Sequence, residues 1–295
     1  MPQGFLYLLA CATAFVTLAA SHATAQNRNR AAGTVSFYVA PGGSDTNDCL
    51  SPSSPCASPQ AACSKAMNEW DFAGYDPFVR LSPGVYNGGC NIAGQPVGAH
   101  TINIVGAQSD DQSCTLDQAG LVTVFPGATQ EGGGIFVFQD LAAGVLRCMT
   151  LEGPGSIGVQ VRQTPVSDIA FVKFGGDQAL ETAVTAGQNG GVNLGGTIWV
   201  GNNHGSLLAV NGGGSRITVA AQIQAVNPVS ITNIAQAYQL GFIEFVMAAN
   251  GPSSFAGPIL TQGSRVWRAG MISSGQNLLP GGCSQADPTQ PGSCY

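Results

Sequence analysis

Short apolar runs separated by glycine-rich, polar breaks recur along the chain from Phe78 onward, and this rhythm restricts the fold more than any other feature. Short apolar runs bounded by turn-forming residues are typical of β-strands rather than helices. The 41 glycines among 295 residues are about twice the usual frequency, which indicates many turns. The expected strands are 78–81, 101–105, 121–125, 135–138, 145–151, 169–174, 197–200, 207–210, 216–219, 229–232 and 242–246.

The strand starts lie about ten to twenty residues apart, which suits either an antiparallel sandwich or the rungs of a coil. Tight hairpins joined by Asn-Gly are few, occurring at Asn87, Asn189, Asn211 and Asn250, and the last three begin or join longer polar loops. This scarcity favours a coil. We therefore expect an all-β fold, a parallel β-helix, over residues 78–275, followed by a C-terminal tail over 276–295.

A single helix is expected near the N-terminus. Ser58 is a good N-cap, Pro59 suits the first helical position, and strong helix formers continue to about Trp70. A β-solenoid needs such an element to cover the open edge of its first coil. Residues 34–77 are therefore predicted to form an N-terminal cap that contains one strand and this capping helix.

The first residues resemble an export signal. The segment 5–20 is almost wholly apolar, and Ala23, Thr24 and Ala25 provide a small-x-small cleavage site. We expect a signal peptide over 1–25, a polar linker over 26–33, and a periplasmic or extracellular location. No later segment has the 18 or more apolar residues that a membrane-spanning helix needs.

Cysteine usage agrees with export. Removal of the signal would remove Cys11 and leave an even number, which in an exported chain indicates disulfides. Eight cysteines allow 105 pairings. Short loops favour the pairs Cys49–Cys56 and Cys283–Cys294, which leaves Cys63–Cys90 and Cys114–Cys148. No metal site is expected, since no Cys-x-x-Cys occurs and the three histidines are scattered.

Two stretches resemble a known group. Residues 38–48 (YVAPGGSDTND), 51–55 (SPSSP), the helix and 79–86 (VRLSPGVY) are similar to the opening of exported right-handed parallel β-helix proteins of the pectin-lyase-like and phage tail-spike group. Residues 263–272, with Asn277, Leu278, Pro280 and Gly281, are similar to the end of phage-tail-like members. The resemblance implies a right-handed coil.

The resemblance also implies an alternative in which the chain cleaves acidic, pectin-like glycans. A hydrolase needs paired carboxylates, and the nearest match is Asp177 with His204 and Arg216. A lyase needs carboxylates that gather Ca²⁺, together with a basic residue. Asp168 and Lys173 flank one expected strand and are its main candidates. Glu152 with Arg147 and Arg162 is a further charge cluster, for which the pairing of charged strand ends across rungs is the favoured explanation. The remaining candidate acids are Asp110, Asp111, Asp117 and Asp140.

Binding without catalysis is the preferred hypothesis. A long β-helix offers a ladder on which aromatic and amide side chains contact a sugar chain. The expected binding group is Trp199, Asn202, Asn203 and His204. A second group consists of Trp267, Arg265 and Arg268, although core packing explains either tryptophan equally well.

Charge restricts the partners. Only 9% of the residues are charged and the net charge is −6, so no basic stripe exists that would bind nucleic acid. We therefore expect an exported protein that binds a polysaccharide or surface glycan, or that has a structural role, without a cofactor. A homotrimer would bury exposed apolar residues. Ca²⁺ is expected only under the lyase alternative.

Overall fold

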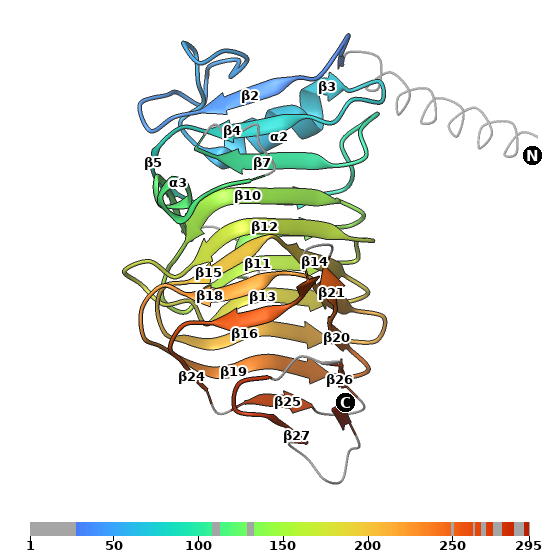
Figure 1. The fold of residues 1–295 in the computed structure, drawn as a ribbon. Coiled ribbons are helices and arrows are strands. Elements are labelled where there is room, and N and C mark those ends of the chain that lie inside the picture. Colours follow the sequence, from blue (N-terminus) through green and yellow to red (C-terminus); the bar gives the residue numbers. More distant parts are fainter. Residues whose placement is uncertain are drawn as a thin grey trace, which may run out of the picture.

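The computed structural model describes residues 28–107, 113–128, 133–248, 251–261, 263–266, 270–273, 279–285 and 292–294. The predicted signal segment lies outside these residues. The described chain forms a parallel β-solenoid of about seven turns. In Figure 1 its strands stack one above another from the N-terminal to the C-terminal end. The predicted parallel β-helix is confirmed, and the antiparallel sandwich is not found.

Two parallel sheets build the solenoid. The large sheet has a main path of ten strands: β2 (Ser36–Val39), β4 (Phe78–Leu81), β7 (Ile102–Gly106), β10 (Gly144–Leu151), β12 (Ser167–Phe174), β14 (Gly191–Gly195), β17 (Arg216–Val219), β20 (Phe242–Phe245), β26 (Met271–Ser273) and β28 (Ser293–Cys294). Its side branches are β5 (Gly84–Asn87), β8 (Val122–Phe125), β15 (Thr197–Val200), β18 (Gln222–Ala225) and β23 (Ser254–Ala256).

The small sheet forms the other side of the coil. It contains β6 (Asn91–Ala93), β9 (Gly134–Gln139), β11 (Ile157–Arg162), β13 (Thr182–Gly187), β16 (His204–Asn211), β19 (Val229–Tyr238), β24 (Ile259–Thr261), β25 (Ser264–Val266) and β27 (Cys283–Gln285). Two short ribbons complete the described strands: β1 (Asn29–Arg30) pairs parallel with β3 (Trp70–Asp71), and β21 (Met247–Ala248) pairs antiparallel with β22 (Gly251–Pro252).

The core is a stack of apolar side chains inside the coil. Strand alternation turns every second residue inward, and parallel register places each on its counterpart one coil away. Leu146 pairs with Ile169, Ile169 with Leu194, and Leu194 with Val219. All four are buried. The repeat is about 25 residues, as the separation of the register partners Asp168 and Asn193 shows.

A left-handed residue bends the large sheet within each central coil. Cys148 has φ 61°, Phe171 has φ 56°, and Gly196 has φ 61°. These residues separate the first half of the large sheet from its second half, which continues as β8, β15 and β18. The bend therefore divides the outer surface of the large sheet into two parts.

The capping helix is α2 (Pro59–Glu69), and it lies at the N-terminal end of the coil (Figure 1). The Ser58 side chain accepts a hydrogen bond from the backbone nitrogen of Ala61, so the predicted N-cap is confirmed. A second helix, α3 (Leu116–Gly120), was not predicted. In the described residues no helix has the length and apolar character needed to cross a membrane.

Four disulfides connect the cysteines in the predicted pairs, two of which short loops favoured and two of which followed from the remaining cysteines. They join Cys49 to Cys56, Cys63 to Cys90, Cys114 to Cys148, and Cys283 to Cys294. Cys63 belongs to α2, so its bond holds the cap on the coil. Cys114 lies just before α3 and holds that helix against β10.

Candidate functional site

The most developed polar surface is the outer face of five successive strands of the large sheet. We define the ladder face as the outward side chains of β10, β12, β14, β17 and β20 before the left-handed bend. Its central row is set by strand register and contains Val145, Asp168, Asn193, Thr218 and Glu244. Because each strand contributes one residue, this row places a polar group on four successive coils.

Two adjoining hollows lie on the ladder face. One has a volume of about 380 Å³ and the other of about 270 Å³, and both are lined by Asn193 and Thr218. The larger hollow exists where three coils carry small residues, Ala170, Gly195 and Ala220. A Cβ atom added to Gly195 would meet nothing within 4 Å. Missing side-chain volume therefore creates the hollow.

The charged side chains of the ladder face differ in their hydrogen-bond and ion-pair partners. Arg147 lines the larger hollow, and its Nε atom is buried without a hydrogen-bond partner among the described residues. Asp168 accepts a 3.1 Å hydrogen bond from Nδ2 of Asn193. Arg216 forms an ion pair with Glu244. A guanidinium beside a hollow can bind a ligand that carries hydroxyl, carbonyl or anionic oxygens.

The two lyase candidates do not share this site. Asp168 is exposed and lines the larger hollow, but Lys173 lies beyond the bend at Phe171 and lines neither hollow. Lys173 is in register with Trp199, and its Cε lies 2.6 Å from the position that a Cβ of Gly201 would occupy. The structure therefore separates this acid from this base.

The charge cluster predicted around Glu152 is also absent. Glu152 is only 5% exposed, and its Oε2 accepts a 2.8 Å hydrogen bond from the backbone nitrogen of Gln178. Arg147 belongs to the large sheet, whereas Arg162 belongs to the small sheet and donates to Gln160. Glu152 therefore anchors a turn, and the two arginines lie in different sheets.

The three hydrolase candidates, His204, Asp177 and Arg216, likewise do not form one site. His204 is 4% exposed, with Nδ1 3.3 Å from the backbone nitrogen of Leu180 and Nε2 3.2 Å from the oxygen of Phe174. Burial lowers the pKa of His204, so the imidazole is held neutral. Asp177 is exposed in a turn, and Arg216 lies in the large sheet rather than beside His204. The two ring nitrogens of His204 therefore contact the backbone at Leu180 and Phe174 and hold these segments in place.

The predicted binding group needs correction as well. Trp199 is 5% exposed and packs with Cys114, Ala119 and Cys148, so its ring is not available for stacking on a sugar. Asn202 donates a 3.0 Å hydrogen bond to the oxygen of Asp177, and Asn203 accepts a 2.6 Å bond from the backbone nitrogen of Ser230. Both amides connect successive coils.

The remaining candidates lie outside the described residues or in helix and turn segments. Asp110, Asp111, Trp267 and Arg268 lie outside the described residues. Asp117 lies in the first turn of α3, and Asp140 lies in the turn before β10. The described part of the chain contains no group of three or more His, Cys, Asp or Glu side chains that could hold a metal ion.

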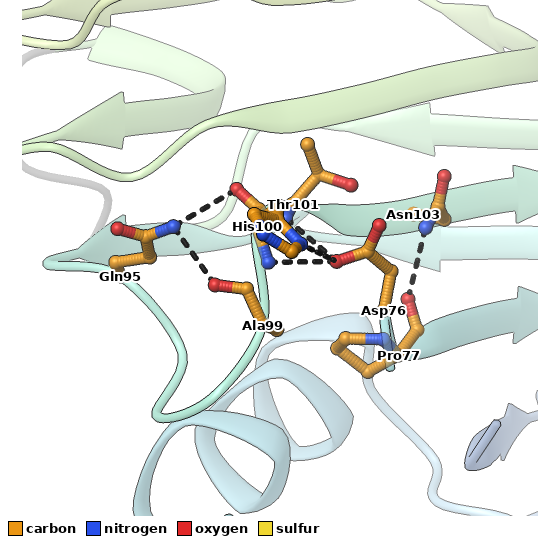
Figure 2. A network of polar contacts seen from close by, with 7 residues as sticks. All are labelled: Asp76, Pro77, Gln95, Ala99, His100, Thr101 and Asn103. Carbon is orange, nitrogen blue, oxygen red and sulfur yellow. Dashed lines mark hydrogen bonds and ion pairs between the residues drawn. The ribbon is translucent and has the colours of Figure 1, made fainter. Parts of the chain in front are cut away.

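A second polar network lies on the loop before β7 (Figure 2). Asp76 Oδ1 accepts hydrogen bonds from the backbone nitrogens of His100, at 2.7 Å, and Thr101, at 3.0 Å. Gln95 Nε2 donates to the backbone oxygens of Ala99 and His100. These hydrogen bonds all end on backbone atoms, so the network shapes the loop.

Comparisons of the chain with protein-family models, with curated proteins and with solved structures found no match. The residues of the ladder face are therefore the main indication of function. Of the residues on this face, only Asp168, Arg147 and Arg216 were candidates in the sequence. Arg147 was assigned to a charge cluster with Glu152, and Arg216 to a hydrolase site. Asn193, Thr218 and Glu244 were missed, although a repeat of about 25 residues would have aligned them with Asp168.

Proposed function

We propose that this chain is an exported β-helix protein that binds a glycan on the ladder face, and that it is related to the pectin-lyase-like and tail-spike group. The four disulfides support export, because such bonds persist in oxidising compartments. Residues 1–25 would then act as the signal peptide. The observation that carries the binding proposal is Arg147, which lines an open hollow and whose buried Nε has no hydrogen-bond partner within the described part of the chain.

The spacing of the ladder face fits a sugar chain. Neighbouring strands lie about 4.8 Å apart, which is close to the length of one residue in an extended polysaccharide. Asp168 offers an acceptor, and Asn193 and Thr218 offer both donors and acceptors, one from each coil. A glycan that runs along the coil axis would therefore meet one polar side chain for each sugar.

Arg147 would provide the strongest single contact. A guanidinium presents several N–H donors, and hydrogen bonds from charged donors are stronger than neutral ones. The Nε–H of Arg147 is already removed from water without a partner. Because the guanidinium is already partly desolvated, a ligand oxygen in the hollow would contact its accessible N–H groups at a lower desolvation cost, so replacement of Arg147 should weaken binding more than replacement of a fully exposed charge.

The test measures retention of the oxidised, full-length secreted protein on a panel of acidic and neutral polysaccharides, with and without calcium. Unsaturated product absorbance and reducing ends are read in the same samples, so that cleavage is detected. Arg147→Gln is the test variant and Arg147→Lys keeps the charge. Arg162→Gln, on the small sheet, is the matched control.

We expect retention on at least one glycan, with a loss of about tenfold or more in affinity for Arg147→Gln and no change for Arg162→Gln. Retention that Arg147→Gln leaves unchanged would place binding elsewhere. Product that disappears in Asp168→Asn or Lys173→Ala would make the protein a lyase, and product lost in Asp177→Asn would make it a hydrolase. Either result would replace the binding proposal.

A further inference from the structure

Three asparagine–glycine pairs lie wholly within the described part of the chain, and all three asparagines are exposed. They are Asn87–Gly88 at the end of β5, Asn189–Gly190 in the turn before β14, and Asn211–Gly212 at the end of β16. A glycine has no side chain to shield its backbone nitrogen, so this nitrogen can attack the side-chain amide of the preceding asparagine. The three pairs therefore carry the same reactive groups at similarly exposed positions.

Backbone hydrogen bonds hold two of these glycine nitrogens in place. The nitrogen of Gly88 donates to the oxygen of Phe125 at 2.8 Å, and the nitrogen of Gly190 donates to the oxygen of Gly187 at 2.9 Å. A backbone amide in such a bond reacts only when the structure around it opens locally. The fold therefore protects the asparagines that precede these two glycines.

The nitrogen of Gly212 is not held in this way. Asn211 is in register with Tyr238, but the oxygen of Tyr238 accepts a 2.8 Å hydrogen bond from the nitrogen of Gly241. Within the described residues, the nitrogen of Gly212 donates no hydrogen bond. This nitrogen can therefore react without a prior local opening of the structure.

The chain at Gly212 also has the space to adopt a reactive geometry. Gly212, Gly213 and Gly214 are consecutive, and glycines give a turn more accessible conformations than other residues. A Cβ added to Gly212 would have its nearest neighbour at 3.5 Å, and one added to Gly213 at 3.8 Å. A Cβ added to Gly190 would instead lie 2.5 Å from the oxygen of Val161, so Gly190 is packed tightly against backbone.

We infer that Asn211 is a site of spontaneous deamidation in the folded protein. The nitrogen of Gly212 loses its proton and forms a bond to Cγ of Asn211, while the Cγ–Nδ2 bond breaks and ammonia leaves with a proton. The product is a five-membered succinimide ring. Water then opens the ring at either carbonyl and gives aspartate or isoaspartate, so the reaction needs no reactant other than water.

The product changes a turn that borders the ladder face. Either form adds a negative charge at this position, and isoaspartate also adds a methylene group to the backbone before Gly212. Ser215 connects this turn to its neighbour, because its nitrogen donates to the oxygen of Gly212 at 3.3 Å and its Oγ accepts a 3.1 Å bond from the nitrogen of Asn189. Asn189 and Gly214 line the smaller hollow. Conversion should therefore reshape this hollow and weaken glycan retention, an effect that rests on the proposed function, whereas the modification itself does not.

The experiment is peptide mapping by mass spectrometry after incubation of the oxidised full-length chain at mildly alkaline pH. The same chain, reduced and unfolded in urea, gives the reactivity of each pair without the fold. We expect the folded chain to deamidate at Asn211 about tenfold or more faster than at Asn87 and Asn189, and the unfolded chain to deamidate at all three at similar rates.

Hydrogen exchange tests the premise, because the amide of Gly212 should exchange faster than those of Gly88 and Gly190. Asn211→Gln is the matched variant, since its longer side chain would have to close a less favourable six-membered ring. This variant should keep the fold and show no conversion at this position. Incubation should lower the glycan retention of the natural chain and leave that of Asn211→Gln unchanged.

The outcomes separate the two proposals. Deamidation of the folded chain that is no faster at Asn211 than at Asn189 would overturn the inference and leave glycan binding intact. Conversion at Asn211 that leaves retention unchanged would support the modification and contradict its effect on the smaller hollow. Conversion at Asn211 in a protein that retains no glycan even before incubation would support the modification and contradict the proposed function.

Discussion

The Nε2 atom of His204 lies 3.2 Å from the backbone oxygen of Phe174, and its Nδ1 atom faces the backbone nitrogen of Leu180. The neutral ring therefore donates at Nε2 and accepts at Nδ1. Nδ1 also lies 3.3 Å from the backbone oxygen of Leu180, so a second ring proton would have an acceptor, and its cost is the burial of a charge. Burial accordingly lowers the pKa of His204 from its ordinary value of 6.5.

A pH dependence of stability follows from this arrangement. Below pH 6.5 the unfolded chain binds a proton at His204 that the folded chain does not, so the free energy of unfolding falls as the pH falls. The slope from one such group is at most about 1.4 kcal/mol per pH unit. Urea unfolding at pH 7.5 and at pH 5.5 measures this change in the free energy of unfolding. His204→Gln should flatten the profile, and His100→Gln, whose side chain is exposed, should not.

The buried carboxylate of Glu152 should contribute to stability and not to chemistry. Glu152→Ala leaves the backbone nitrogen of Gln178 without its acceptor and should cost about 1–3 kcal/mol. Glu152→Gln keeps an acceptor oxygen and should cost clearly less. Denaturant unfolding of the two variants measures the difference. Equal losses in both would indicate that the negative charge itself matters at this position.

The same substitution should have very different effects on stability at two adjacent glycines. Gly196 has φ 61°, and an added Cβ would lie 2.5 Å from the ring of Phe171, so Gly196→Val should destabilise the protein by about 2 kcal/mol or more. Gly195 has open space around it, so Gly195→Val should change stability little. Melting temperatures decide between these outcomes, and a similar loss for both variants would contradict the structure around the bend.

Leu141 and Leu240 adopt left-handed backbone conformations, which should lower the stability of the folded chain. Leu141→Asn and Leu240→Asn place a residue that tolerates positive φ in turns at φ 75° and 66°, and each should stabilise the monomer by about 0.5–1 kcal/mol. Urea unfolding of each variant measures the change. A loss of stability in both variants would show that these side chains make contacts within the monomer.

The strand rhythm predicted much of the fold, because large apolar residues mark the inward positions of most coils. The limits of β4, β15 and β17 agree with the predicted ones. Strands β13 and β14 were missed because alanine and glycine replace the usual large residues, and their stability comes from the neighbouring strands. Helix α3 was missed because it is short, although Thr115 and Gln118 form a capping box.

The candidate site was harder to predict than the fold. Residues of the ladder face are one coil apart in sequence, so their proximity appears only when the register of each strand is known. Trp199 was placed wrongly because its outer position is covered by α3, which the Cys114–Cys148 disulfide holds against the sheet. The sequence around Trp199 does not show that α3, which comes much earlier in the chain, covers this strand.

The most direct test of glycan binding on the ladder face fills the larger hollow without disturbing the coil. Calorimetric titration of Gly195→Val is carried out with the polysaccharide that the natural chain retains, and Gly213→Ala, whose added Cβ makes only ordinary contacts with Leu240, is the control. We predict that Gly195→Val folds normally and loses about tenfold or more in affinity, while Gly213→Ala binds unchanged. Unchanged binding by a correctly folded Gly195→Val would contradict the account.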